Sequence, residues 1–471
     1  MCFLLMLGAC RGRTAPERGP RLDATVAVNP TAPAADTGAA LARSPDAAPA
    51  VAEGCVRVPE ALETVGRNAI VTSLSLRAVT APEPAALLAW AVPPLRAHGG
   101  DDLALARLSG DLRSVTMLDP EEPSDARGLG RSPLSVFHAF VRVRGGSPPA
   151  YSVDSDRLSR DEDGNEFVEC GDLTGQVSAV DPGSDDTVPR RLLPRALTYC
   201  RTASQVERPF VLGLTLVGPP DAPTGLGFFA TRSRTGPSGA LPWRLPVDTA
   251  ELRRARAPAA FLRDHTPEGL EVAELPGSGY ALAFRHEGRL HLGYLDPSLR
   301  ALGPLHPVPT LGGEPGRPRL AVDGQGLLLV VADRPQGDAG SAPYTLFASR
   351  LAWATPPVAL TPLAASLPLV PAPGHLFAPW AAPLEDGGWA VAFSAGALQL
   401  RAEGDRQQVW LQRFAPALQP RGAPLLVADD ASDPRAVVVP SGPAPTLLLA
   451  MASGRSQHRA VLLRAYRCPS P

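Results

Sequence analysis

Lysine is absent from this chain of 471 residues, isoleucine occurs once, at Ile70, and aromatic residues make up 5%. Without lysine the chain cannot contain a P-loop, because that motif places a lysine side chain on the phosphates of a nucleotide. No run of about 18 or more apolar residues occurs, so the sequence offers no candidate transmembrane helix. The formal net charge of −2 provides no overall field that would attract a nucleic acid.

Proline and glycine are abundant instead, with 54 and 44 residues, which favours many short strands and turns over long helices. Hydrophobic residues make up 44% and charged residues 20%, enough to bury a core over most of the chain. In residues 11–54, however, large apolar side chains are nearly absent. Such a segment cannot offset its chain entropy by burial, so we expect residues 10–54 to form a disordered, semi-extended tether.

The chain begins with a short apolar run that ends in Leu7-Gly8-Ala9-Cys10. This tetrapeptide resembles a lipobox, and the resemblance implies that residues 1–9 are a signal peptide and that Cys10 is lipidated. No basic residue precedes the run, unlike in an ordinary signal peptide. A start upstream of Met1 and a chance apolar start on a soluble protein therefore both stay open. Arg11, which is not an aspartate, favours lipid anchoring in the outer membrane of the cell envelope.

Cleavage before Cys10 leaves four cysteines in the rest of the mature chain. An even number of cysteines in an oxidising compartment indicates disulfides, although four cysteines allow three connectivities. We favour Cys55–Cys468, which brackets the predicted folded region, and Cys170–Cys200, which closes a local loop. Buried free thiols are the alternative, and no C-x-x-C spacing supports a zinc site.

A repeat of short apolar segments is the strongest structural feature of the sequence. Four such segments begin at Gly279, Gly326, Gly388 and Pro445, so their starts are separated by 47, 62 and 57 residues. Each is too short for a helix and begins at glycine or proline, which predicts a buried strand. After a polar gap, each is followed by an alternating segment that we predict to be its partner strand. These partners cover residues 290–295, 345–351, 409–414 and 461–466.

A third element precedes two of the buried strands, at residues 318–322 (Pro-Arg-Leu-Ala-Val) and 434–438 (Pro-Arg-Ala-Val-Val). Residues 258–262 lie near one further period upstream. Three or four strands in a unit of roughly 45–65 residues are typical of a propeller blade. Further apolar segments in the front half bring the number of units to seven; they cover residues 86–90, 136–141 and 226–230.

The sequence therefore predicts an all-β domain over residues 55–471, a β-propeller of seven blades. Six or eight blades, or a pair of β-sandwiches, are the alternatives. The strand expected at residues 69–76 has no unit of its own. We expect it to pair with the final strand at 461–466 and so to remove the open edge of the ring, with the Cys55–Cys468 bridge across that seam.

The Leu-Gly-Ala-Cys start, the Pro/Ala-rich tether and the strand Gly388-Trp389-Ala390-Val391-Ala392-Phe393 together resemble surface lipoproteins of GC-rich Gram-negative bacteria with degenerate propeller repeats. The resemblance covers nearly the whole chain. It implies a propeller fold and a membrane anchor, and it carries over no active site.

No segment carries a specific catalytic motif. Residues 225–230 formally fit a dinucleotide fingerprint, but no convincing helix follows them, and a strand start is favoured. The pair His286 and His291 has one residue too many between its histidines for a zincin motif. The sequence accordingly predicts no cofactor.

An acidic loop before Cys170 contains Asp161, Asp163 and Asn165 around a turn glycine. Calcium takes several oxygen ligands, but this loop lacks the first ligand and the final glutamate of an EF-hand. A solvated surface loop is therefore favoured over a metal site. The arginines between residues 189 and 256 are likewise interpreted as solubilising surface in preference to an anion-binding rim.

These observations predict an envelope-anchored, non-catalytic binding or scaffolding protein with a protein or glycan ligand. The alternative is a carbohydrate-active hydrolase or lyase with its site at the channel mouth, which needs two carboxylates about 5–9.5 Å apart. Fold alone does not choose between the two. Polar side chains gathered at the channel mouth, or an exposed patch formed by Trp90, Trp243 and Trp380, would support a ligand site.

Overall fold

The computed structural model describes residues 55–59, 61, 64–67, 70–79, 85–92, 102–117, 138–141, 149–153, 158–160, 166–171, 175–179, 199–201, 209–217, 224–231, 239–245, 267–311, 313, 315–335, 342–357, 359–363, 374–398, 405–440, 444–453 and 460–468. Over these ranges the chain forms strands and turns and no α-helix, so no helix there is long and apolar enough to cross a membrane. The strands form eight antiparallel sheets.

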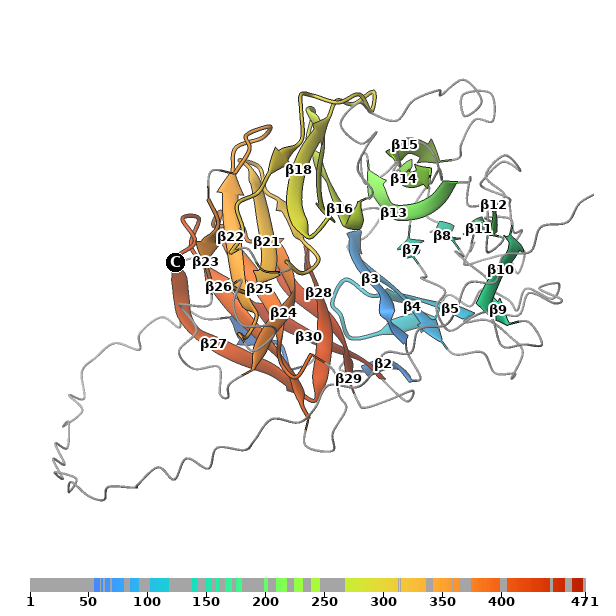
Figure 1. Ribbon diagram of the computed structural model, residues 1–471. Helices are drawn as coiled ribbons and strands as arrows, with labels where there is room; N and C mark the ends of the chain where they lie inside the picture. The colour runs from blue at the N-terminus through green and yellow to red at the C-terminus, as the bar shows by residue number, and fades with distance from the viewer. Residues whose placement is uncertain are drawn as a thin grey trace, which may run out of the picture. The chain divides into compact units, whose positions relative to one another are not determined.

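Three consecutive four-stranded sheets have the same topology, in which strands that follow one another in sequence lie side by side (Figure 1). The first sheet contains β16 (Glu268–Leu275), β17 (Gly279–His286), β18 (Arg289–Leu295) and β19 (His306–Pro307). The second contains β20 (Arg319–Val322), β21 (Leu327–Asp333), β22 (Thr345–Leu351) and β23 (Thr361–Pro362). The third contains β24 (His375–Pro383), β25 (Trp389–Gly396), β26 (Gln407–Phe414) and β27 (Pro420–Asp429).

The front half of the chain adds four sheets. One contains β3 (Ile70–Val79), β4 (Ala85–Val92), β5 (Asp102–Leu108) and β6 (Val115–Met117). The next two contain β7 (His138–Val141), β8 (Pro149–Val153) and β11 (Gly175–Ala179), and β13 (Pro209–Val217), β14 (Thr224–Thr231) and β15 (Gly239–Leu245). The last contains β9 (Leu158–Arg160), β10 (Glu166–Gly171) and β12 (Tyr199–Arg201).

The eighth sheet joins the two ends of the described chain. It contains β28 (Ala431–Val439), β29 (Thr446–Ser453) and β30 (Ala460–Arg467), and its outer edge is completed by β1 (Val56–Arg57) and β2 (Thr64–Arg67), which both pair with β30. The Cys55–Cys468 disulfide lies next to this pairing, as predicted. The prediction that residues 69–76 pair with the final strand is wrong. Residues 70–76 lie in β3, which pairs with β4, because two shorter strands nearer the N-terminus already occupy the edge of β30.

In the sheets whose strands follow one another in sequence, which we call regular sheets, the first strand contacts the first strands of the neighbouring sheets. We call this first strand the inner strand of its sheet. Contacts of this kind link β16 to β20, β20 to β24, β24 to β28 and β28 to β3. The hydrophobic core lies between consecutive sheets, and each cluster is shared by two of them. One cluster joins Leu328 and Val330 of β21 to Trp389 and Phe393 of β25. Full burial of a side chain of this kind stabilises the fold by roughly 1.5–3 kcal/mol.

Glycine before the buried strands has a steric cause. In three consecutive sheets, a Cβ at the glycine that precedes or begins the second strand would collide with a carbonyl oxygen at the end of the third strand. The larger residue would push these two strands apart, so the repeat needs glycine at this position. The glycine–carbonyl pairs are Gly279–Leu295, Gly326–Leu351 and Gly388–Phe414.

The structure confirms the predicted buried strands at β17, β21, β25 and β29 and their partners at β18, β22, β26 and β30. Residues 318–322 and 434–438 lie in or next to inner strands, as the repeat predicted. Residues 258–262 lie outside the described residues, and the inner strand of that sheet is β16. The segment at 136–141 corresponds to β7, an edge strand of its sheet. The fold is all-β and β-propeller-like.

Candidate functional site

Three inner strands contain a β-bulge at the same place. The ladder register shifts just before Glu271 in β16, Trp380 in β24 and Arg435 in β28. Two positions before each of these residues the backbone has a positive φ. The residues concerned are Gly269, Ala378 and Asp433, with φ of 60°, 47° and 53°. Bulges re-aim side chains, and left-handed backbone at a residue other than glycine is costly. Their recurrence indicates that the orientation of the next side chains is constrained.

Four side chains occupy equivalent positions on four consecutive inner strands. They are Glu271, Arg319, Trp380 and Arg435, which we call the inner-strand belt. Their equivalence follows from the ladder, because three of them pair with the fourth residue after the start of the adjacent strand's repeat and Arg435 pairs with the fifth. The paired residues are Ala283, Val330, Ala392 and Ala450.

The members of the inner-strand belt contact one another in strand order. Arg319 Nη1 lies 2.9 Å from Glu271 Oε2. The guanidinium carbons of Arg319 and Arg435 lie 4.5 and 4.8 Å from the centroid of the Trp380 ring, which is cation–π distance. Trp380 itself is fixed by a 2.8 Å hydrogen bond from Nε1 to the carbonyl of Ala436. The contacts therefore run without interruption from β16 to β28.

Arg435 continues this line to the first sheet. The residue is 8% exposed, and its guanidinium donates hydrogen bonds to the carbonyl oxygens of Leu74, Asp433 and Pro434. Among the described residues no carboxylate lies within ion-pair distance of it. Burial lowers the pKa of Arg435 to about 9, and the like charge of Arg319 contributes in the same direction. A buried cation without a carboxylate is unusual in a core, since such charges are ordinarily paired.

The solvent-facing end of the inner-strand belt is at Arg317. Its side chain is 43% exposed, and its Nη2 lies 3.7 Å from Glu271 Oε2 and 3.4 Å from the carbonyl of Leu270. Desolvation, followed by the like charge of Arg319, lowers the pKa of Arg317. Glu271 is therefore shared by two guanidinium groups, with the shorter contact to Arg319.

Two further charged residues, on the inner strands of separate sheets, interact electrostatically. Arg77 lies on β3 and Glu274 on β16. Burial lowers the pKa of Arg77, and the carboxylate of Glu274 opposes this shift. Charged side chains thus recur on several inner strands.

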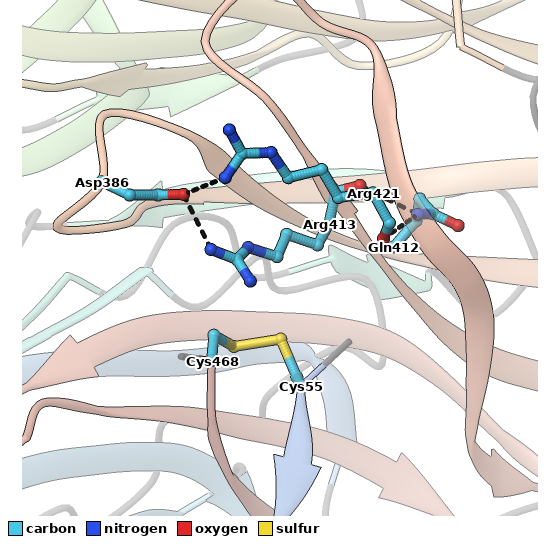
Figure 2. Close-up of a disulfide and its surroundings, with 6 residues drawn as sticks. All are labelled: Cys55, Asp386, Gln412, Arg413, Arg421 and Cys468. Atoms are coloured by element: carbon cyan, nitrogen blue, oxygen red, sulfur yellow. Dashed lines mark hydrogen bonds and ion pairs between the residues drawn. A yellow bond between two sulfur atoms is a disulfide. The ribbon is translucent and has the colours of Figure 1, made fainter. Parts of the chain in front are cut away.

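A second cluster of charged side chains has a structural role. Asp386, in the turn between β24 and β25, accepts hydrogen bonds from Arg413 at 2.7 Å and Arg421 at 2.6 Å (Figure 2). Burial alone would raise the pKa of Asp386, but the hydrogen bonds from Arg413 and from the backbone of Gly388, together with the charges of Arg413 and Arg421, outweigh it and lower this pKa. In the neighbouring sheet Asp323 and Arg350 form an equivalent pair at 2.9 Å. Figure 2 places the Asp386 cluster near the disulfide.

The residues predicted from sequence to form sites are distributed differently. Cys10 and the proposed metal ligands Asp161, Asp163 and Asn165 lie outside the described residues. The metal site is therefore untested, and in the described part of the chain no group of acidic, His or Cys residues suits a metal ion. The backbone places Cys170 on β10 and Cys200 on the adjacent strand β12; a bridge between them stays a prediction.

The tryptophans do not form the exposed patch that was considered. Trp90 is 2% exposed and packs between the first and last sheets. Trp380 is half-buried between two arginines. The backbone of Trp243 lies in β15, and its side chain lies outside the described part of the structure.

The sequence analysis missed the inner-strand belt, although one feature pointed to it. Pro318-Arg319 and Pro434-Arg435 are the same dipeptide at the same position of two repeats, and Pro379-Trp380 occupies that position in the repeat between them. An arginine repeated on an inner strand was an indication of the site.

No protein-family model and no curated protein matches this sequence. Among solved structures, a sialidase of Streptococcus pneumoniae is 9% identical with a TM-score of 0.41, over 86% of this chain and 70% of that one. An alpha-L-arabinofuranosidase of Fusarium graminearum is 9% identical with a TM-score of 0.39, over 86% and 98%. An endo-arabinase from Bacteroides thetaiotaomicron is 15% identical with a TM-score of 0.32, over 55% and 94%. Identities this low carry no function over to this chain.

Proposed function

We propose that this chain is a non-catalytic binding protein built as a closed seven-bladed propeller, with its ligand site at the inner-strand belt. The observation that carries the proposal is the placement of Glu271, Arg319, Trp380 and Arg435 at one position of four consecutive inner strands. Bulges repeat the same local geometry in three of those strands. A purely structural core would be expected to place apolar residues there.

Seven inner strands support the blade count. Contacts link β3 to β7, β7 to β13 and β13 to β16, and then continue through β20, β24 and β28 back to β3. In the sheet of β9, β10 and β12, the first two strands lie between β8 and β11 in sequence and β12 follows β11, so this sheet is interpreted as an addition to the second blade. Closure through β1, β2 and the disulfide removes the edge that an open arrangement would expose.

Binding is favoured over hydrolysis by the number of carboxylates in the inner-strand belt. A glycosidase uses two carboxylates that flank the scissile bond. The inner-strand belt contains one, Glu271, and its carboxylate is shared by Arg319 and Arg317. A carbohydrate-active hydrolase or lyase remains the competing function, and the test below separates the two.

The test is a glycan and peptide array probed with the full chain, followed by mass spectrometry of each bound ligand after prolonged incubation. The proposal predicts that at least one ligand class binds and is recovered intact. Shortened or unsaturated saccharides would establish the hydrolase or lyase instead. The variant Glu271→Gln keeps the shape of the side chain and should alter affinity without creating or removing turnover.

Envelope anchoring is proposed from the sequence of the N-terminus alone. The supporting residues are Leu7 to Cys10, which resemble a lipobox, and Arg11, which favours the outer membrane. Intact mass of the protein purified from the membrane fraction tests this directly. A chain that begins at Cys10 and carries acyl chains is expected; an unlipidated chain from the soluble fraction would contradict it.

A further inference from the structure

The inner-strand belt has more positive than negative charge. Arg317 and Arg319 both contact the carboxylate of Glu271, and Arg319 and Arg435 both lie on the ring of Trp380. Among the described residues, Glu271 is the one carboxylate within ion-pair distance of these three guanidinium groups. The positive charges therefore outnumber the negative charge that they contact. In a desolvated site this excess is costly, because charges interact more strongly at low effective dielectric constant. A bound anion would remove that cost.

Arg317 is the member of this group that a ligand can reach. Its side chain is 43% exposed, whereas Arg319 and Arg435 are each 8% exposed. Both described contacts of Arg317 Nη2 are long, at 3.4 and 3.7 Å. If a ligand displaced them, Glu271 would stay paired with Arg319 at 2.9 Å. Binding at Arg317 therefore leaves no buried carboxylate unpaired.

Other cations lie at the same end of the sheets. Arg317 lies two residues before the start of β20, and Arg334 immediately follows β21, the antiparallel neighbour of β20. Arg334 stacks at 4.9 Å on the ring of Tyr344. Arg285 of β17 donates a 2.9 Å hydrogen bond to the carbonyl of Pro315, which places it beside the segment that leads to Arg317.

We propose that this end of the inner-strand belt binds the carboxylate of an acidic ligand, with Arg317 as the direct contact. The inference rests on the proposed binding function and names its ligand chemistry. A guanidinium group presents donors in a fork that matches a carboxylate, and such charge-assisted hydrogen bonds are stronger than neutral ones. The carboxylate can belong to a uronic-acid saccharide or to an acidic peptide, and the experiment has one arm for each.

Calorimetric titration of the full chain tests the proposal with three probes: trigalacturonate, its neutral counterpart galactotriose, and triglutamate. At least one of the two acidic probes should bind, and galactotriose should bind at least about tenfold more weakly. Affinity for the acidic probe should fall as salt is raised, because the contact is partly exposed. Failure of both acidic probes to bind would overturn the inference.

Variants locate the site. Arg317→Gln should weaken binding of the acidic probe by about tenfold or more, the loss expected for one charge-assisted hydrogen bond. Arg406→Gln is the matched control, because Arg406 is also exposed and also lies near a carboxylate, that of Asp429 at 3.9 Å, but is on the outer part of its sheet. Equal loss in both variants, or none in Arg317→Gln, would overturn the placement. If only neutral ligands from the array bound tightly, recognition through a carboxylate would be wrong, whereas the proposed binding function would still hold.

Discussion

Nε of Arg435 donates a 3.0 Å hydrogen bond to the carbonyl oxygen of Leu74, which lies 361 residues earlier in the chain. Arg435 lies on β28, in the last sheet, and Leu74 lies on β3, in the first regular sheet. The bond therefore crosses the seam where the fold closes. Leu74 is available because the register between β3 and β4 shifts between Ile70 and Ser75. The seam is thus joined at its inner side by Arg435 and at its outer side by β1, β2 and the disulfide.

Arg435→Met should reduce the free energy of unfolding by roughly 1–3 kcal/mol, because the carbonyl of Leu74 loses its partner in a buried setting. Urea denaturation measures this change. Arg406→Met is the control, since an exposed arginine should change stability by no more than about 0.5 kcal/mol. If Arg435→Met were as stable as the wild type, Arg435 would have no part in closing the fold.

Asp386→Asn should destabilise the protein more strongly, by roughly 3–5 kcal/mol, because it leaves the buried guanidinium of Arg413 without its carboxylate. The pKa of Asp386 is lowered in the folded state, so its stabilising contribution is present above its unfolded pKa of 3.8 and is lost as the pH falls below that value. The difference in stability between wild type and variant should therefore shrink in acid. A difference independent of pH would contradict the ion pair.

His375 predicts a second dependence on pH. Its Nδ1 accepts a 3.2 Å hydrogen bond from the backbone N–H of Tyr344, and desolvation, followed by the charge of Arg334, lowers its pKa below 6.5. The unfolded chain then takes up a proton before the folded one, so stability should fall as the pH drops through 6.5 and level off below the folded pKa. Urea unfolding between pH 7.5 and 5 should show this component in the wild type. His375→Asn should lack it.

The Cys55–Cys468 disulfide should contribute roughly 3–5 kcal/mol, because it closes a very long loop in the unfolded chain. Cys468→Ser, measured against the wild type by guanidinium denaturation, should show that loss together with faster hydrogen exchange in β1 and β30. Cys200→Ser is the comparison. A change confined to Cys200→Ser, with none in Cys468→Ser, would contradict the role given to the closing bridge.

Much of the fold was predictable because each repeat carries a recognisable local sequence pattern. Gly279, Gly326 and Gly388 mark the buried strands, since the third strand's carbonyl leaves no room for a Cβ. The Cys55–Cys468 pair was predictable from its place at the two ends of the domain. The pairing of β1 and β2 with β30 was not, because strands of two and four residues carry no periodic pattern.

The candidate site was harder to predict because its residues converge from separate repeats. Arg319 and Arg435 appeared in the sequence as members of two similar strands. Only the structure shows that Trp380, on the strand between them, brings the two guanidinium groups onto one ring. The bulges that orient these side chains depend on ladder register, which a single strand's sequence does not specify.

The proposed ligand site is the inner-strand belt. Hydrogen exchange of the full chain with and without trigalacturonate or triglutamate, whichever binds, tests that placement most directly. We expect protection in peptides covering β16, β20 and β24 and the segment from Pro315 to Arg317, and no change in β27, which carries the carboxylate of Asp429. Protection confined to other strands, or a bound probe that protects none of these peptides, would contradict it.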